Sequence, residues 1–433
     1  MRLSKYIVKK ENSNSYILFS TISKTIIKVD KEYYAKLKSD NINNLLSKSD
    51  LEFLKNNYFL VKDDIDERKI VKYIMNKERL DQKIFSSYMT FSTMCNFACV
   101  YCYEEGQTNR DNIMSKETLN DVINWYDFII KKNNYKEIRV CLFGGEPLIH
   151  KDLIKLFVTE LDKIVKCNDA KLSITMVTNG YLLDQKTITF LKEHNLEEIQ
   201  ITIDGVGKIH DERRPLKSGK GTFDKILENI INAPKFNGRF LFRVSFDKNN
   251  LKNVKELLKY LSKLNIVNEY DVYLAPIHNT TSQECQHCSF CNLNIYNEDD
   301  EIIKNYKELY GYMKNLNMEI PKYYTNGPCM SISNDSVLID NEGNLFKCVE
   351  MIGIEDLKIG NVKDLEYNNN YFNFVGIPLY EECINRDCKY VALCGGGCIM
   401  KSYLKDRTLN NIDCQLKYFE ELIPFFLGVN YDE

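Results

Sequence analysis

Two hydrophobic patterns alternate along the middle of the chain. Between residues 84 and 277, short apolar runs typical of buried strands are separated by longer segments in which apolar residues return every three or four positions. In one of these segments, Leu251, Val254, Leu258 and Leu261 fall on one face of a helix. The six strand-like runs cover residues 88–94, 138–143, 172–177, 199–203, 240–246 and 272–275. This alternation predicts an α/β fold with a parallel sheet and right-handed crossovers.

The first 65 residues follow a different pattern. Short strands are expected at 6–8, 16–19 and 25–29, and two helices are expected after them. The second helix is expected to begin at Ser49, because Glu52 stands three residues later, as in a capping box. The chain therefore opens with a small unit of its own.

Residue types suited to chemistry follow the first four predicted strands of the middle region. In a parallel α/β fold, binding and catalytic residues gather at the carboxyl ends of the strands. The segments after these strands contain, in chain order, Cys95, Cys99 and Cys102, then Gly144 to Pro147, then Thr178 to Gly180, then Asp204 and Gly205. The sequence thus predicts one site at one edge of the sheet.

Cys95, Cys99 and Cys102 are separated by three and two residues. Because iron-sulfur clusters normally take four cysteine ligands, three thiolates on one loop can hold a [4Fe-4S] cluster and leave one iron open. A structural zinc site is the alternative, although such sites usually have four Cys or His ligands in paired spacings. Together with Gly144-Gly145-Glu146-Pro147 one strand-helix-strand unit downstream, the triplet resembles the radical S-adenosylmethionine (SAM) family.

The resemblance implies a partial TIM-like barrel of six β/α units, with SAM chelating the open iron. Gly144 and Gly145 would bring bare backbone against the methionine moiety, and the Glu146 carboxylate would bind its ammonium. Further SAM contacts are implied by position: Tyr101 with the adenine, Thr202 and Asp204 with the ribose and the carboxylate, and Arg214 with the carboxylate. A packing role for Tyr101 and a surface ion pair for the arginine remain the alternatives.

A second group of cysteines follows the predicted barrel. The spacing of Cys329, Gly343, Cys348 and the later cysteines resembles the SPASM domain, an auxiliary-cluster extension of radical SAM enzymes that act on peptides and proteins. Residues 341–344 carry a hairpin signal, so Cys329 and Cys348 can face one another across two strands. One spacing departs from the family pattern, because four residues lie between Cys383 and Cys388 instead of the usual two.

By resemblance, this second group would hold one or two auxiliary [4Fe-4S] clusters. One set would be Cys383, Cys388, Cys394 and Cys414, and the other would be Cys329, Cys348 and Cys398, which lacks a fourth ligand. The missing ligand would come from Cys285, Cys288 or Cys291, or the open iron would bind a substrate thiolate. Alternatively, that triplet and His287 hold zinc. Cys141 and Cys167 are expected to be buried apolar residues.

The amino-terminal unit resembles a reduced form of the small winged-helix domain that binds the leader of ribosomal precursor peptides. The alternative is a short structural lead-in to the barrel. The expected organisation is therefore a leader-binding-like unit over 1–70, a radical SAM core over 84–277, a connection over 278–328 and a SPASM domain over 329–433.

Composition narrows the class of partner and the location. The formal net charge of −3 over 433 residues gives no global attraction for nucleic acid. No signal peptide is recognisable, and no apolar run approaches the length of a membrane helix. Fifteen grouped cysteines favour metal binding in a reducing compartment. We therefore expect a cytoplasmic protein with a small precursor peptide as substrate and a flavodoxin- or ferredoxin-like electron donor.

These resemblances imply a peptide maturase. Reductive cleavage of SAM would give a 5′-deoxyadenosyl radical, which would abstract hydrogen from the peptide and lead to a thioether, as in sactisynthases, or to another crosslink. Formylglycine formation, as in anaerobic sulfatase-maturing enzymes, and epimerisation are the alternatives within the fold. A non-enzymatic iron-sulfur carrier or peptide-binding scaffold is the alternative from another class. No catalytic side chain can be named from the sequence.

Overall fold

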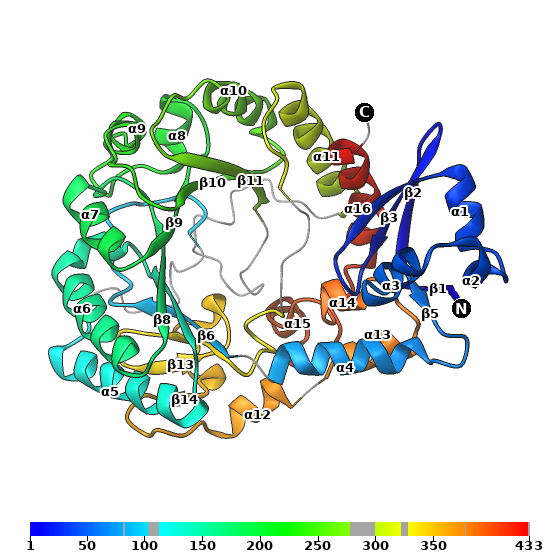
Figure 1. Cartoon of the computed structure of the whole chain (residues 1–433). Coiled ribbons are helices and arrows are strands. Elements are labelled where there is room, and N and C mark those ends of the chain that lie inside the picture. Colours follow the sequence, from blue (N-terminus) through cyan, green and yellow to red (C-terminus); the bar gives the residue numbers. More distant parts are fainter. Residues whose placement is uncertain (81–82, 103–111, 278–298, 322–327, 377, 432–433) are drawn as a thin grey trace.

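The computed structural model describes residues 1–80, 83–102, 112–277, 299–321, 328–376 and 378–431. Within these residues the strands form a nine-stranded sheet, a three-stranded sheet and a two-stranded pair. Figure 1 shows the large sheet curved inside a row of helices, with the amino-terminal unit to one side. No helix in this part of the chain is long and apolar enough to cross a membrane.

The curved sheet contains six parallel strands that lie in sequence order. They are β6 (Ile84–Thr90), β7 (Glu137–Phe143), β8 (Lys171–Thr178), β9 (Leu196–Thr202), β10 (Arg239–Phe246) and β11 (Glu269–Pro276). The helices on its outer side are α5 (Lys116–Asn133), α6 (Lys151–Cys167), α7 (Gln185–Glu193), α8 (Lys208–Arg213), α9 (Phe223–Ile231) and α10 (Leu251–Leu261). The predicted α/β class and the six-stranded parallel sheet are confirmed.

Alternation along each strand separates the two faces of this sheet. On β7, Ile138, Val140 and Leu142 are fully buried in the core that the helices complete. Because successive side chains on a strand point to opposite faces, Cys141 and Phe143 face the hollow side. The side chains on the hollow side are not part of this packed core, so this side of the sheet can hold a ligand.

The first barrel strand differs from the prediction. A strand was expected over residues 88–94, but β6 spans Ile84–Thr90. Its first half contains Ser86 and Ser87, and these polar residues interrupt the apolar pattern expected of a buried strand. In the structure, Ser87 is buried and its hydroxyl forms a hydrogen bond with the Tyr126 hydroxyl. Beyond Thr90 the backbone turns away, and the Phe91 carbonyl accepts from Met114 N (2.8 Å) instead of continuing the ladder. Residues 91–94 therefore begin the cysteine loop.

The carboxy-terminal region extends the barrel sheet from the β6 edge. Strand β12 (Ser336–Ile339) pairs in parallel with β6, and β13 (Asn344–Phe346) and β14 (Gly360–Asn361) continue the sheet in antiparallel fashion. The predicted hairpin is confirmed, and Gly343 at its turn has φ +81°. The remaining helices are α11 (Asp299–Asn315), α12 (Asn369–Val375), α13 (Tyr380–Asn385), α14 (Val391–Cys394), α15 (Ile399–Asp406) and α16 (Leu416–Tyr431). Short 3-10 turns span Pro147–His150, Val349–Met351 and Glu355–Leu357.

The three predicted amino-terminal strands are present as an antiparallel sheet. They are β2 (Ile7–Glu11), β3 (Ser15–Ser20) and β4 (Ile26–Asp30), followed by helices α1 (Lys31–Leu37), α2 (Ile42–Leu45) and α3 (Lys48–Asn56). A further pair, β1 (Arg2–Leu3) and β5 (Leu60–Val61), closes the unit, and α4 (Glu67–Leu80) leads to the barrel.

The predicted start of the second amino-terminal helix was wrong by two residues. Ser47, and not Ser49, is the N-cap of α3, because its hydroxyl accepts from the backbone N–H of Asp50 (3.0 Å). The helix count was also short by one, since the four-residue α2 has too few residues to show a helical period.

Candidate functional site

A cavity of about 340 Å³ opens at the carboxyl ends of the barrel strands. Its wall includes all three cysteines of the first triplet, the glycine pair and several strand-end residues. The residues from the predicted site that line it are Cys95, Cys99, Tyr101, Cys102, Gly144, Gly145, Thr202 and Arg214. The structure therefore brings most of the predicted site residues to one place, where α/β folds hold their ligands.

The thiols of Cys95, Cys99 and Cys102 lie close enough to influence one another. Burial, together with the negative charges of Glu146 and of the other two thiolates, raises the pKa of Cys95 to about 12. The pKa of Cys99 is raised to about 11 by burial. Buried thiols that hold their protons so firmly need a cation before they can act as thiolates.

This donor set fits an iron-sulfur cluster better than a single ion. In the described part of the chain, no three His, Cys, Asp or Glu side chains converge closely enough to hold one metal ion. A [4Fe-4S] cluster spreads its thiolate ligands over separate corners, so thiols that share a cavity wall without converging suit it. Among the hydrogen bonds that hold the loop, Ala98 N donates to Pro215 O (2.9 Å) and Val100 N donates to Arg213 O (3.1 Å).

The glycine pair is required by the cysteine loop itself. A Cβ on Gly145 would lie 2.3 Å from Met94 O and 2.4 Å from Thr93 O, and both are backbone atoms. Gly144 has φ +127°, a conformation that side chains disfavour. Contact with methionine was the reason expected from the sequence. The structure adds a second reason, because the two loops pack backbone to backbone.

Glu146 is fully buried, and its carboxylate joins the ends of two strands. It accepts from Thr178 Oγ1 (2.7 Å), Asn179 N (2.7 Å) and Leu148 N (3.0 Å). Burial raises the pKa of Glu146, while these hydrogen bonds act in the opposite direction. A carboxylate has about four acceptor positions, so one remains for a ligand ammonium.

Tyr101, Asp204 and the two arginines at the end of α8, Arg213 and Arg214, form a buried charged network. The Tyr101 hydroxyl donates to Asp204 and accepts from Arg214 Nη1 (2.7 Å), while Arg213 pairs with Asp247 (2.8 Å). Burial opposes ionisation of Asp204, but the guanidinium groups of Arg214 and Arg213 outweigh it and keep the pKa of Asp204 below its usual value. Arg214 also lines the cavity.

Several buried polar atoms of this network are available to bind a ligand. Within the described residues, Asp204 Oδ1, Arg213 Nη2 and Arg214 Nε are buried and have no hydrogen-bond partner. Such atoms are costly to leave unpaired, so they suit a ligand that carries both an anionic and a cationic group. SAM is a ligand of this kind.

The later cysteines fall into the two sets that the SPASM resemblance implies. In the outer set, burial and then the thiolates of Cys388, Cys394 and Cys414 raise the pKa of Cys383 to about 11. In the inner set, burial and then the charges of Glu350 and Cys329 raise the pKa of Cys398. Cys348 interacts with both Cys329 and Cys398. Each set therefore shares one local environment.

The unusual spacing between Cys383 and Cys388 has a simple structural cause. The extra residues complete the last turn of α13 and a left-handed position at Asp387 (φ 55°). Cys388 N then donates to Cys383 O (3.0 Å), which closes the turn and brings the two thiols together.

Five cysteines remain besides the first triplet and these two sets. Cys285, Cys288 and Cys291 lie outside the described residues. Cys141 is partly buried on the hollow side of β7. The expectation of a buried Cys167 was wrong, because this residue ends α6 and is exposed.

Among the polar residues of the cavity wall that were not identified from the sequence, three come from other parts of the chain than the cysteine loop. Gln200 and Arg243 come from β9 and β10, and Glu350 follows Cys348 closely. Arg243 donates to Ser245 Oγ (2.8 Å), and burial raises the pKa of Glu350 while Lys401 and Arg243 oppose the rise. The arginine inside the otherwise apolar run Phe240-Leu241-Phe242-Arg243-Val244 was a signal that could have been used.

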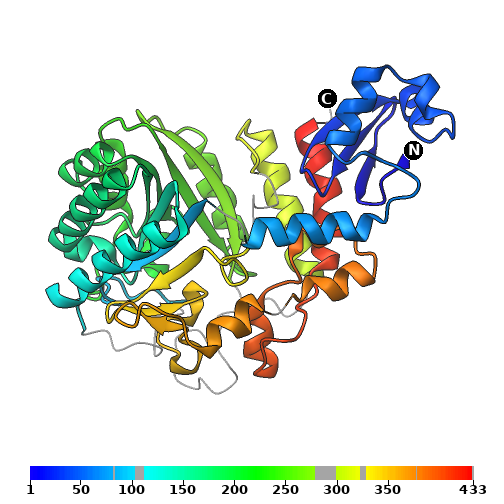
Figure 2. The same ribbon diagram turned by 60° about the horizontal axis from the view of Figure 1, so that its bottom comes forward.

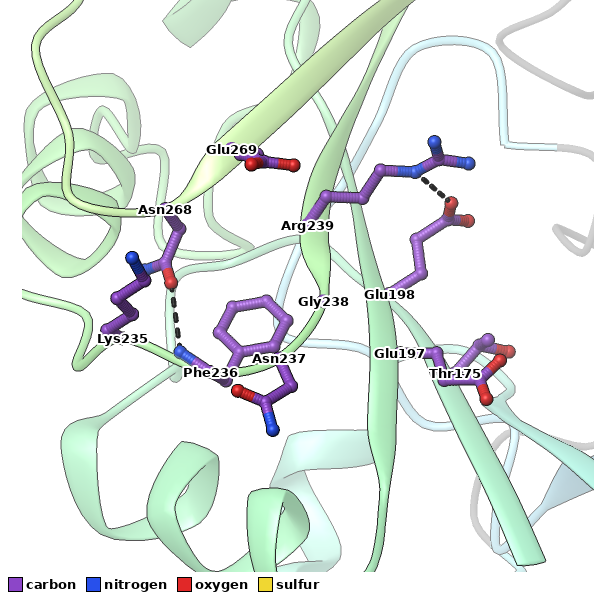
Figure 3. Close-up of a pocket in the computed structure, with 10 residues that line it drawn as sticks. All are labelled: Thr175, Glu197, Glu198, Lys235, Phe236, Asn237, Gly238, Arg239, Asn268 and Glu269. Atoms are coloured by element: carbon purple, nitrogen blue, oxygen red, sulfur yellow. Dashed lines mark hydrogen bonds and ion pairs between the residues drawn. The ribbon is translucent and has the colours of Figure 1, made fainter.

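A second cavity, of about 570 Å³, lies at the opposite end of the strands. Figure 3 shows Arg239 donating to Glu198 (3.1 Å) and Asn268 accepting from Phe236 N (3.1 Å) in its wall. Among the described residues, its wall contains the carboxylates of Glu197, Glu198 and Glu269 but no cysteine that could bind an iron-sulfur cluster. This cavity is larger than the first one, and it lies at the amino ends of the strands, where α/β folds seldom place their chemistry.

Comparison with known proteins also indicates the radical SAM family. Residues 89–261 match the Radical SAM superfamily model. The cysteine-type anaerobic sulfatase-maturating enzyme of Clostridium novyi is 24% identical over 77% of this chain and 93% of its own length. Two solved structures share the fold. Native anSMEcpe with bound AdoMet and Cp18Cys peptide has a TM-score of 0.63 at 20% identity, over 81% of this chain and 100% of that one. Streptococcus suis SuiB bound to precursor peptide SuiA has a TM-score of 0.50 at 15% identity, over 96% and 99%.

Proposed function

Because the chain is a radical SAM enzyme related to the anaerobic sulfatase-maturating enzymes and to SuiB-type peptide maturases, we propose that it crosslinks a small ribosomally made peptide, with a thioether as the favoured bond. The observation that carries the proposal is the position of the inner cysteine set. Val349 and Glu350, directly after Cys348, line the same cavity as Cys95, Cys99 and Cys102. A peptide in that cavity would touch both the radical source and the inner set.

The first triplet would hold a [4Fe-4S] cluster, and Gly144, Gly145, Glu146, Thr202, Asp204 and Arg214 would hold SAM. When bound, these cofactors supply a 5′-deoxyadenosyl radical, which removes a hydrogen atom from the substrate. Tyr101 orients Arg214 and Asp204 through its hydroxyl. The buried charges of these residues would fix the amino acid end of SAM and exclude water from it.

Crosslink formation also needs an acceptor for an electron. Joining a thiol sulfur to a carbon radical releases one proton and one electron. The inner set of Cys329, Cys348 and Cys398 would hold an auxiliary cluster beside the cavity, and the outer set of Cys383, Cys388, Cys394 and Cys414 would hold a second one. The fourth ligand of the inner cluster would be one of Cys285, Cys288 and Cys291, or a thiolate of the substrate.

Formylglycine formation is the second candidate, favoured by the similarity to sulfatase-maturating enzymes over most of the chain. The non-enzymatic carrier or scaffold is set aside, because the chain is a radical SAM enzyme. Epimerisation remains an outcome of the test below.

The deciding experiment is mass spectrometry of the small peptide encoded beside this gene after anaerobic turnover with SAM and reductant in deuterated water. A thioether or other crosslink gives a loss of two hydrogens per event. Gain of one deuterium without oxidation indicates epimerisation, and conversion of a cysteine to formylglycine gives a different loss that includes sulfur. A Cys95→Ala variant serves as the control and should leave the peptide unchanged.

Residues 1–70 would bind the leader of that peptide, while residues 84–277, 278–328 and 329–433 would act as radical core, connection and SPASM domain. A flavodoxin- or ferredoxin-like protein would supply the electron. Such donors and reduced thiols are found together in the cytoplasm, which is the location we propose.

A further inference from the structure

The amino-terminal sheet covers the outer cysteine set. Its inner face carries Val8, Ile17 and Phe19, which are buried against Tyr390 and against residues of α16. Cys388 and Cys394 border the same hydrophobic cluster. Figures 1 and 2 both show this sheet beside α16 and the segment around α14. The unit that resembles a leader-binding domain is thus also part of the wall around three of the predicted cluster ligands, Cys383, Cys388 and Cys394.

Polar contacts fix this wall to the residues on both sides of Cys388. The Thr21 hydroxyl donates to the Lys389 carbonyl (2.6 Å), and the Lys5 ammonium pairs with the Asp387 carboxylate. The turn that presents Cys388 is therefore held from the amino-terminal unit. Movement of that unit would be transmitted to the outer set.

Tyr6 is the residue of this wall whose hydroxyl indicates that a bound group supplies a hydrogen-bond acceptor. Its side chain is completely buried, yet its hydroxyl has no hydrogen-bond partner among the described residues. It packs in a cluster bordered by Cys383 and Cys388. Burial, followed by the negative charges of Asp387, Glu67 and the Cys388 thiolate, raises the pKa of Tyr6, which places all three groups within electrostatic reach.

The two carboxylates near Tyr6 bind other donors. Glu67 accepts from Arg2, Ser4 and the Lys5 backbone, and Asp387 accepts from Lys5, while neither lies within hydrogen-bond distance of the Tyr6 hydroxyl. A cluster bound at Cys388 would add sulfides beside this residue, and sulfide is an acceptor that a buried hydroxyl can use. Hydrogen bonds to cluster sulfur and exclusion of water both set the reduction potential of an iron-sulfur centre.

We propose that Tyr6 is a positioning residue whose hydroxyl donates a hydrogen bond to the sulfur of the outer auxiliary cluster and raises its reduction potential. The inference rests on the proposed occupation of Cys383, Cys388, Cys394 and Cys414 by such a cluster. It gives the amino-terminal unit a second task beside leader binding, namely control of an electron acceptor.

The test is a redox titration of the full-length, reconstituted protein, followed by electron paramagnetic resonance. A Cys414→Ala variant identifies the signal of the outer cluster. Tyr6→Phe should move the midpoint of that signal to a more negative potential and leave the other midpoints and the iron content unchanged. Tyr16→Phe is the matched control, because its hydroxyl bonds Glu11 on the exposed side of the same unit, and it should change no midpoint.

An unchanged outer midpoint in Tyr6→Phe overturns the inference. If that variant loads less iron, Tyr6→3-fluorotyrosine decides, since it keeps the shape and has a more acidic hydroxyl. It should move the midpoint to a more positive potential, and no movement again contradicts the proposal. If Cys414→Ala loses neither iron nor a signal, the outer set holds no cluster, and the proposed function fails at that point instead.

Discussion

At the scale of single residues, the tightest constraint in the site is the contact between the glycine pair and the cysteine loop. In Gly145→Ala, the new methyl group would meet two backbone carbonyls that cannot move away separately. We expect the iron content of the first cluster site and the rate of SAM cleavage to fall at least about tenfold, since a displaced loop misplaces reacting groups. Colorimetric iron analysis and 5′-deoxyadenosine quantitation after reconstitution measure these effects.

Gly311→Ala is the matched control for that substitution. Gly311 lies inside α11 with open space around the added methyl group. Alanine is favoured over glycine in a helix by about 1 kcal/mol, so the stability of the protein should stay level or rise. The iron content and the rate of SAM cleavage should not change. Equal iron content and activity in the two variants would show that the close approach at Gly145 has no functional consequence.

Because of His210, we expect the cluster-free protein to become less stable as the pH falls. Burial lowers the pKa of His210 to about 4, and its Nδ1 accepts from Asp204 N (3.2 Å). The unfolded chain takes up a proton near pH 6.5, whereas the folded chain resists protonation until about pH 4. Stability is therefore fully present above pH 6.5 and falls as the pH drops through this window, by roughly 3 kcal/mol for this group.

Urea unfolding of the cluster-free protein at pH 7 and pH 5 measures this loss. His210→Asn keeps an acceptor for the Asp204 backbone but does not titrate, so its stability should change less between the two pH values. A wild-type protein that is as acid-sensitive as the variant would contradict the assignment.

At the scale of elements, the connecting helix α4 depends on one buried side chain. Arg79 donates to Ile332 O (3.0 Å), to the Tyr380 hydroxyl (2.7 Å) and to Val375 O. It thereby ties α4 to segments near both cysteine sets. Arg79→Met should lower the free energy of unfolding by about 3 kcal/mol or more, because several buried acceptors lose a charged donor. Denaturant unfolding checks this, with Arg68→Met on the exposed face of the same helix as the control.

The elements differ in how far their sequences revealed them. Strands and helices of the barrel showed clear periods, because one face of each is buried in a continuous core. The motifs after those strands could be placed at one edge for the same reason. By contrast, Gln200, Arg243 and Glu350 meet only in the folded chain, because they come from two strands and a 3-10 turn far apart in sequence. The packing of Tyr6 near Cys388 was equally hidden, since 381 residues lie between them.

At the scale of the whole molecule, the amino-terminal unit and the outer cysteine set form one packed body. Removal of residues 1–65 would therefore expose Tyr390, Phe419 and Ile423, in addition to removing the proposed leader-binding surface. We expect the truncated protein to lose outer-cluster iron and to aggregate. Deletion is thus a poor test of leader binding, for which point substitutions on the exposed face of α3, such as Phe53→Ser, are better suited.

The spatial separation of the three cysteine groups predicts that SAM cleavage and peptide chemistry can be uncoupled. SAM cleavage requires the first triplet and the cavity, whereas crosslinking also requires an acceptor beside Glu350. The triple variant Cys95→Ala, Cys99→Ala, Cys102→Ala should keep the auxiliary iron but produce no 5′-deoxyadenosine. Cys398→Ala and Cys414→Ala should each lose about four irons and still cleave SAM. Peptide modification should be reduced most strongly in Cys398→Ala, because the inner set adjoins the cavity through Val349 and Glu350. Equal loss of peptide modification in the two variants would mean that both auxiliary sites lie on the path of the electron, and full modification in Cys398→Ala would remove the inner set from that path.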